Sequence, residues 1–217
     1  MQRVDHVTAL CVDRDVLHLG CTNWPYAAES DANGQLLHRT ISSVASRCVG
    51  FDSDAAGISA LEALGFTDLV VGDVERLDEL KDIGQFDVVL AGEIIEHLGN
   101  PERFLTAAAA VLRPGGVLVV TTVNAYCAFR FVMYALRGKA GEQEPVHPDH
   151  VAYYSRSTLT LALNRTGWNV RDFRYYDIGR EHRPFNSRWI RIVNDVAVRI
   201  APHLGDGVIA VCARGEN

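Results

Sequence analysis

Five short apolar runs recur along the chain, each followed by a turn residue or an acid, and helical patterns separate them. The runs occupy residues 16–21, 49–52, 70–74, 86–93 and 116–122. Apolar runs of this length, bounded by turn residues, are typical of parallel strands that are covered on both faces. The sequence therefore predicts an α/β fold with a doubly wound, mainly parallel sheet, and its 217 residues suit a single domain spanning 1–217.

The residues that end the first four runs suit a nucleoside. They are Gly20, Asp52, Asp73 and Glu93. Ligands of open parallel sheets bind beyond the carboxyl ends of the strands. A glycine there lets the backbone approach a ligand closely, and a carboxylate can accept hydrogen bonds from both hydroxyls of a ribose. These residues predict a nucleoside-sized pocket at that edge.

The remaining elements follow from helix signals and turn residues. Helices are expected over residues 36–46, 55–64, 101–113, 126–137, 158–164 and 189–200, and two further strands over 168–176 and 208–213. Asn100 and Ser155 suit helix N-caps. The first strand is expected to begin near Val16, which leaves almost no N-terminal extension to form a lid. Residues 138–149 are expected to form a loop over the site.

Composition and charge indicate the cellular compartment of the protein and the kinds of partner to expect. The five cysteines are scattered and lack metal-type spacing, which predicts free thiols in a cytoplasmic protein. No apolar run is long enough to span a bilayer, so no membrane partner is expected. The net charge is −6, yet ten arginines stand against six acids from Val151 onward. Arginines match phosphate and carboxylate geometry, so either an anionic acceptor or a solvated helix face explains them.

In their order, these residues resemble the class I S-adenosylmethionine-dependent methyltransferases. The resemblance runs from Val16 to about Arg214 and implies a seven-stranded sheet with a reversed last strand. It implies S-adenosylmethionine as cofactor, with the methionine portion at the first strand, the ribose at the second and the adenine edge at the third. The cofactor-binding residues that it implies are Gly20, Cys21, Asp52, Asp73, Val74 and Glu93.

Two positions depart from the pattern of that family. The family usually has an acid at position 18 and a glycine at position 22, where this chain has His18 and Thr22. The methionine end of the pocket is therefore expected to be built differently, with the loop from Thr22 to Gly34 compensating. His18 is expected to be either a hydrogen-bonded core histidine or a pocket contact. A nicotinamide-type G-x-G-x-x-G is absent, which counts against a dehydrogenase.

The sequence Glu93-Ile94-Ile95-Glu96-His97 holds two acids and a histidine that would share one face of a helical turn. Such ligands suit Mg²⁺, Mn²⁺ or Fe²⁺. The pattern is similar to two metal-dependent groups, the small-RNA 3′-terminal 2′-O-methyltransferases and the ubiquinone-biosynthesis O-methyltransferases. The metal ligands implied by the first group are Glu93, Glu96, His97 and His150. The implied ion, Mg²⁺ or Mn²⁺, would lower the pKa of an attacking alcohol.

A second interpretation of this turn needs no metal. Acids at a helix start also complement the helix dipole, and His97 or His150 would then act as general base beside Glu93. The first hypothesis for function is O-methylation of a hydroxyl on a sugar, polyketide or quinone-like small molecule. The alternatives are an RNA 2′-O-methyltransferase, which the overall acidity disfavours, and a non-catalytic nucleoside-binding regulator.

Overall fold

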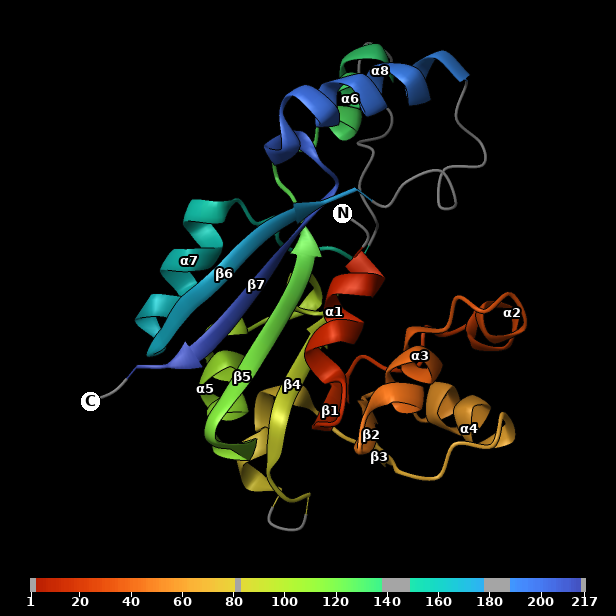
Figure 1. Cartoon of the computed structure of the whole chain (residues 1–217), viewed down its shortest axis with the longest axis vertical. Coiled ribbons are helices and arrows are strands. Elements are labelled where there is room, and N and C mark those ends of the chain that lie inside the picture. Colours follow the sequence, from red (N-terminus) through yellow and green to blue (C-terminus); the bar gives the residue numbers. More distant parts are fainter. Residues whose placement is uncertain (1–2, 81–82, 138–148, 178–187, 216–217) are drawn as a thin grey trace.

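The computed structural model describes residues 3–80, 83–137, 149–177 and 188–215, and its seven strands form one sheet (Figure 1). The order across the sheet is β3-β2-β1-β4-β5-β7-β6. The strands are β1 (Asp15–Leu19), β2 (Arg47–Asp52), β3 (Leu69–Val71), β4 (Phe86–Gly92), β5 (Leu112–Val123), β6 (Trp168–Tyr176) and β7 (Gly207–Arg214). β1 to β5 pair in parallel, whereas β7 is antiparallel to both β5 and β6. The predicted doubly wound, mainly parallel sheet with a reversed last strand is confirmed.

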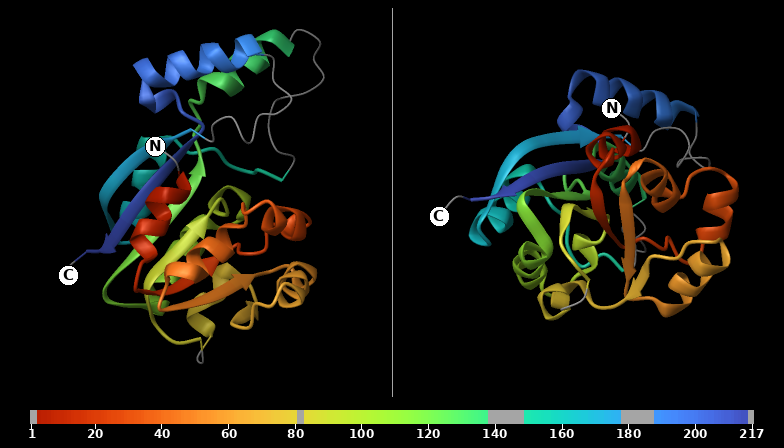
Figure 2. Two further views of the ribbon diagram at one scale, coloured as in Figure 1. Left: turned by 45° about the vertical axis from the view of Figure 1, so that its right-hand side comes forward. Right: turned by 60° about the horizontal axis from the view of Figure 1, so that its bottom comes forward.

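Helices cover both faces of this sheet (Figures 1 and 2). The helices are α1 (Arg3–Cys11), α2 (Ala27–Ala32), α3 (Leu37–Val44), α4 (Ala55–Ala63), α5 (Pro101–Ala108), α6 (Ala128–Arg137), α7 (Arg156–Arg165) and α8 (Arg188–Ile200). Short 3₁₀ turns are η1 (Val74–Glu79), η2 (Ile95–His97), η3 (Ala109–Val111) and η5 (Pro202–Leu204). We call the side of the sheet that packs against α1 and α3 the α1 face, and the side that packs against α5 and α7 the α5 face.

Strand periodicity divides the core between these two faces. In β4, Val88 and Leu90 belong to the cluster on the α1 face, while Val89 and Ala91 belong to the cluster on the α5 face. Successive side chains of a strand point to opposite faces, so both faces of a central strand must be apolar. This requirement explains the continuous apolar runs in the sequence.

The expected helix starts are set by side-chain caps. Asn100 accepts a hydrogen bond from the Arg103 backbone N–H at 3.0 Å and precedes Pro101 at the start of α5. Ser155 and Thr158 form a reciprocal capping box at the start of α7. Each cap satisfies backbone donors that the first turn of a helix leaves without partners.

One helix was missed, and two local expectations are wrong. The expected loop from Thr22 to Gly34 contains a helix, α2, over Ala27–Ala32. Residues before the first strand form α1, in which Val7 and Cys11 are buried, although two apolar residues one turn apart give too weak a pattern to identify from sequence. Strand β5 begins at Leu112, and its pairing with β4 shifts register between Phe86 and Val88, so residues 114–116 lie within the strand rather than before it. Residues 138–148 of the expected loop lie outside the described residues.

Helices α6 and α8 lie beyond the carboxyl ends of the parallel strands, apart from the layers on the sheet (Figures 1 and 2). Their connections to the sheet are tied together: Arg130 donates hydrogen bonds to the carbonyls of Asn124 and Asp206, at 2.6 and 2.8 Å. The Asn124 side chain donates to the carbonyls of His203 and Gly205, both at 2.8 Å. The chain that leaves β5 and the chain that enters β7 are thus held as one unit.

Within the described ranges, none of the helices combines the length and the apolar character that crossing a membrane would need.

Gly20 should be intolerant of substitution. It has a φ of +69°, and a Cβ there would lie 2.3 Å from Ile94 Cγ2. We expect Gly20→Ala to lower the free energy of unfolding by roughly 2–4 kcal/mol, because backbone strain and overpacking add. The matched control is Gly34→Ala, since Gly34 has a φ of +68° but open space around it. Urea denaturation that shows equal losses for both variants would contradict the packing argument.

Candidate active site

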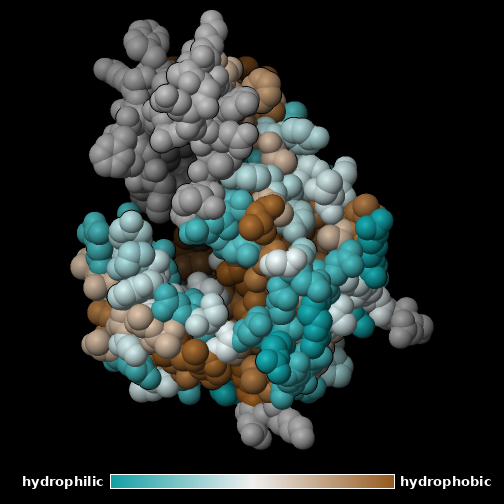
Figure 3. Space-filling view, turned by 180° about the vertical axis from the view of Figure 1, so that it is seen from behind, coloured by the Kyte–Doolittle hydropathy of each residue, from teal (hydrophilic) through white to brown (hydrophobic). Residues whose placement is uncertain are grey.

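The predicted cofactor residues of the first two strands lie next to each other. β1 and β2 pair in parallel up to Leu19 and Phe51, and the Gly20 N–H donates to the Phe51 carbonyl at 2.9 Å. Gly20, Cys21 and Asp52 therefore meet at the carboxyl edge of the sheet. Burial and the nearby Asp52 charge raise the pKa of the Cys21 thiol, which keeps it neutral. Seen from behind, the surface has a hollow with apolar walls between the side that carries α2 and α4 and the rest of the molecule (Figure 3).

Asp52 is oriented by Thr22, a contact that the sequence did not reveal. Its Oδ2 accepts hydrogen bonds from the Thr22 hydroxyl at 2.8 Å and from the Thr22 N–H at 3.2 Å. Its Oδ1 accepts from the Asp54 N–H at 3.0 Å. A carboxylate offers about four acceptor positions, so about one remains, on Oδ1, for a ligand hydroxyl. The expected grip on both ribose hydroxyls would require Thr22 to give up a bond.

The two residues predicted to contact adenine follow β3. Asp73 is exposed, and its carboxylate accepts a hydrogen bond from the Glu75 N–H at 2.9 Å, which caps η1. Val74 is half-buried at the start of η1. Both residues thus lie on the same edge as Asp52, one strand further out, because β3 pairs with β2 up to Asp52 and Val71.

His18 is a core residue that pairs with His38 of α3. Their Nδ1 atoms lie 3.1 Å apart, and both side chains are buried. Burial lowers the pKa of both imidazoles, that of His38 to about 4, so both are neutral and one donates to the other. The first interpretation of His18, a hydrogen-bonded core histidine, agrees with this arrangement.

Glu93 does not share a helical face with Glu96 and His97, so that expectation is wrong. The helical turn η2 begins only at Ile95, and Glu93 has a φ of +56°. Its N–H donates to the Thr121 carbonyl at 3.0 Å, which continues the β4–β5 pairing by one residue. Its carboxylate accepts a hydrogen bond from the Tyr176 hydroxyl and lies 3.5 Å from Nη1 of Arg3.

Glu96 lies on the α5 face and is fully buried. Its Oε2 accepts a hydrogen bond from the Thr122 hydroxyl at 2.8 Å, while its buried Oε1 has no hydrogen-bond partner among the described residues. Burial, followed by the nearby Glu93 charge, raises the pKa of Glu96 to about 7. A buried carboxyl oxygen without a donor is costly unless it serves a ligand or a proton.

His97 and His150 stand beside Glu96. The His97 Nδ1 lies 3.1 Å from the Asp149 carbonyl, and the two imidazole rings meet edge-on with centroids 4.6 Å apart. One ligand atom from each of Glu96, His97 and His150 falls within 4.8 Å of the others. Because a carbonyl only accepts, this contact places the proton on Nδ1 of His97 and the lone pair on Nε2, which is the tautomer that a metal ligand needs. With the orphaned Glu96 oxygen, this donor set fits a divalent ion.

The structure therefore separates the four predicted metal ligands into three and one. Glu96, His97 and His150 lie together, whereas Glu93 is engaged by Arg3 and Tyr176 on the α1 face. Arg3 and Tyr176 were missed because nothing in their local sequence marks them. Thr122 offered only a weak signal, as a polar residue at the end of an apolar strand.

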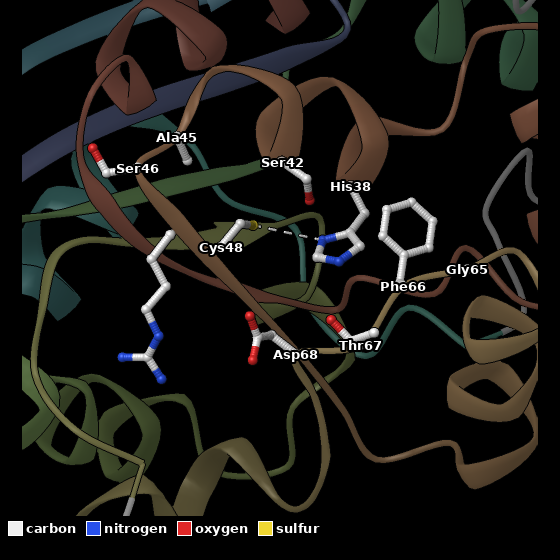
Figure 4. Close-up of a pocket in the computed structure, with 10 residues that line it drawn as sticks. His38, Ser42, Ala45, Ser46, Cys48, Gly65, Phe66, Thr67 and Asp68 are labelled. Carbon is white, nitrogen blue, oxygen red and sulfur yellow. Dashed lines mark hydrogen bonds between the residues drawn. The ribbon is translucent and has the colours of Figure 1, made fainter.

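A separate cavity of about 270 Å³ lies near the start of β2 (Figure 4). His38 and Phe66 line it, and Cys48 Sγ lies 3.8 Å from His38 Nδ1. Burial raises the pKa of the Cys48 thiol to about 11, so this cysteine is not a reactive thiolate at neutral pH. Because ligands of such sheets bind at the carboxyl edge, we do not assign this cavity to the active site.

The raised pKa of Glu96 predicts how stability depends on pH. Its carboxyl titrates near 4.5 in the unfolded chain and near 7 when folded, so folding favours the protonated form. That contribution is fully present below about pH 4.5 and is lost as the pH rises through about 7. The stability of the native chain relative to Glu96→Gln should fall by roughly 1–3 kcal/mol between pH 5 and pH 8.

This difference is measured by urea denaturation of both proteins in the presence of a chelator. Taking the difference removes the titration of the other groups, which both proteins share. A constant difference across this pH range would show that Glu96 is not held in its protonated form.

Comparisons with known proteins identify the family of this chain. The sequence pattern of the methyltransferase-domain family matches residues 13–172. A probable S-adenosylmethionine-dependent methyltransferase of Mycolicibacterium smegmatis is 31% identical over 172 residues, which cover 79% of this chain and 57% of that protein. A ubiquinone biosynthesis O-methyltransferase of a Bradyrhizobium strain is 30% identical over 188 residues, covering 82% of this chain and 70% of the relative.

A solved structure shares the fold. The crystal structure of a SAM-dependent methyltransferase from Archaeoglobus fulgidus superimposes with a TM-score of 0.59 at 18% identity, covering 98% of this chain and 94% of the other. The family match includes most of the carboxyl edge described above, from Gly20 to His150. The chain belongs to the S-adenosylmethionine-dependent methyltransferases.

Proposed function

We propose that this methyltransferase transfers the methyl group to a hydroxyl of a small molecule. The observation that carries the proposal is the group of Glu96, His97 and His150, which combines a buried carboxylate with two imidazoles beside the end of β4. Such groups bind a hydroxyl and remove its proton, which is what O-methylation requires of a protein. The names of the ubiquinone-biosynthesis relatives support the same chemistry.

In this proposal the cofactor lies across the carboxyl ends of β1, β2 and β3. S-adenosylmethionine supplies a methyl group that is already activated by its sulfonium. Gly20 and Cys21 line the methionine portion, and Asp52 accepts one ribose hydroxyl through Oδ1 while Thr22 holds the carboxylate in place. Asp73 and Val74 lie at the adenine edge. The protein contributes mainly the alignment of the acceptor oxygen with the methyl carbon.

The acceptor hydroxyl lies at the Glu96, His97 and His150 group. A divalent ion, Mg²⁺ or Mn²⁺, held by these three side chains would lower the pKa of the hydroxyl. Without an ion, His97 or His150 takes the proton directly as a general base. In its ionised form, Glu96 stabilises the charge of such an ion or of the imidazolium that forms beside it.

The assignment of the ribose predicts the effect of Asp52→Ala. Loss of a charged acceptor should weaken binding of the product S-adenosylhomocysteine by roughly 10- to 150-fold. Isothermal titration calorimetry measures this change. Asp78→Ala is the matched control, because Asp78 is a surface acid paired with Arg103. Equal affinities for both variants and the native chain would place the ribose elsewhere.

The assignment of the acceptor site predicts a dependence on divalent ions. Transfer of a labelled methyl group to a panel of sugars, catechols and short RNAs should rise with Mg²⁺ or Mn²⁺ and disappear in chelator. Glu96→Ala should abolish transfer while calorimetry shows unchanged binding of S-adenosylhomocysteine.

Transfer that persists in chelator would contradict the metal and leave the imidazoles as the base. Preferred methylation of RNA over the small molecules would overturn the acceptor class. Loss of cofactor binding in Glu96→Ala would contradict the division between the two subsites.

A further inference from the structure

The Glu93 side chain contacts two residues that lie far from it in the sequence, Arg3 and Tyr176. Tyr176, the last residue of β6, donates its hydroxyl proton to Glu93 Oε1. Nη1 of Arg3, the first residue of α1, lies 3.5 Å from the same oxygen and 3.4 Å from the Thr121 hydroxyl oxygen. The Arg3 guanidinium carbon lies 5.9 Å from the centre of the Tyr176 ring, so the two partners also contact each other.

The packing around Tyr176 leaves its hydroxyl little freedom. The ring is 2% exposed and lies against Gly207, where a Cβ would be 2.1 Å from Tyr176 Cζ. Only a glycine at position 207 leaves room for the ring in this place. A buried phenol needs a hydrogen-bond partner, and the Glu93 carboxylate provides it.

Glu93 stands at the junction of β4 with the end of β1. Its neighbours in the chain, Gly92 and Ile94, both approach Gly20: a Cβ at Gly20 would lie 3.6 Å from the Gly92 carbonyl oxygen and 2.3 Å from Ile94 Cγ2. The φ of +56° at Glu93 costs about 1–3 kcal/mol for a residue other than glycine. The surrounding contacts must therefore hold the residue in this conformation.

We propose that Arg3 and Tyr176 are positioning residues that fix the Glu93 carboxylate on the α1 face, where it faces the cationic end of the cofactor. We call these two residues, with their contacts to Glu93, the clamp; both lie outside residues 13–172, which match the family pattern. The clamp keeps Glu93 apart from Glu96, His97 and His150. This inference rests on the proposed cofactor site.

Cofactor binding tests the clamp without any acceptor. Calorimetry with S-adenosylmethionine should show a Kd raised about 2- to 10-fold by Tyr176→Phe and by Arg3→Gln. Arg3→Lys should recover most of the affinity, since it keeps the cation. Arg113→Gln is the matched control, because Arg113 forms ion pairs with Asp15 and Asp87 at the amino ends of β1 and β4.

A double-mutant cycle separates positioning from general destabilisation. In a Glu93→Gln background, Tyr176→Phe and Arg3→Gln should change the Kd no further, because the group they position is gone. Equal losses in both backgrounds, or native affinity in both single variants, would overturn the clamp. Asp52→Ala distinguishes failure of the clamp from failure of the cofactor site. If Asp52→Ala weakens cofactor binding while the clamp variants do not, only the clamp is wrong. If Asp52→Ala has no effect, the proposed cofactor site itself is wrong.

Discussion

The arrangement of the active site depends on the parallel pairing of β4 with β5 up to its last residues. Gly92 pairs with Thr121, and the Glu93 N–H continues the ladder to the Thr121 carbonyl at 3.0 Å. Side chains of a strand alternate between faces, so Thr121 points to the α1 face and Thr122 to the α5 face. Arg3 donates a hydrogen bond to the Thr121 hydroxyl and forms an ion pair with Glu93. The Thr122 hydroxyl donates a hydrogen bond to Glu96. One backbone ladder thus sends the two acids of a short turn to opposite sides of the sheet.

On the α5 face, hydrogen bonds to its side chain and backbone help to keep the Glu96 carboxyl in the core. Glu96 is buried, but its side chain receives the Thr122 hydroxyl, and its backbone carbonyl receives the N–H groups of Val151 and Ala152 at 2.9 and 3.2 Å. Those two bonds dock the segment that carries His150 against the turn. Oε1 has no hydrogen-bond partner among the described residues, and a buried polar atom in that state costs about 1–3 kcal/mol unless a ligand or a proton uses it.

The sequence predicted the features that depend on neighbouring residues. Apolar runs located β1 to β5, and the strands expected over 168–176 and 208–213 are also present. The caps at Asn100 and Ser155 follow from residue types a few positions apart. The group of Glu96, His97 and His150 was also predicted, through a resemblance. The positive φ of Glu93 was not, because it depends on where the β4–β5 pairing ends. Nor was its contact with Arg3, since a pair ninety positions apart in sequence meets only once the order of the strands is known.

The departures at positions 18 and 22 bear on how the cofactor is recognised. Each replacement has acquired an internal partner: His18 pairs with the His38 imidazole, and Thr22 donates twice to Asp52. The neutral His18–His38 pair brings no charge to the edge of β1, and Asp52 retains about one free acceptor position, on Oδ1. His18 stands where the family usually has an acid, and the Asp52 carboxylate already accepts three hydrogen bonds. This edge of the sheet therefore attracts a cation less strongly. Glu93 is a further acid at this edge, because its neighbours Gly92 and Ile94 both approach Gly20, and its backbone there has a φ of +56°. In the proposed clamp, Arg3 and Tyr176 set where this carboxylate lies relative to the cofactor.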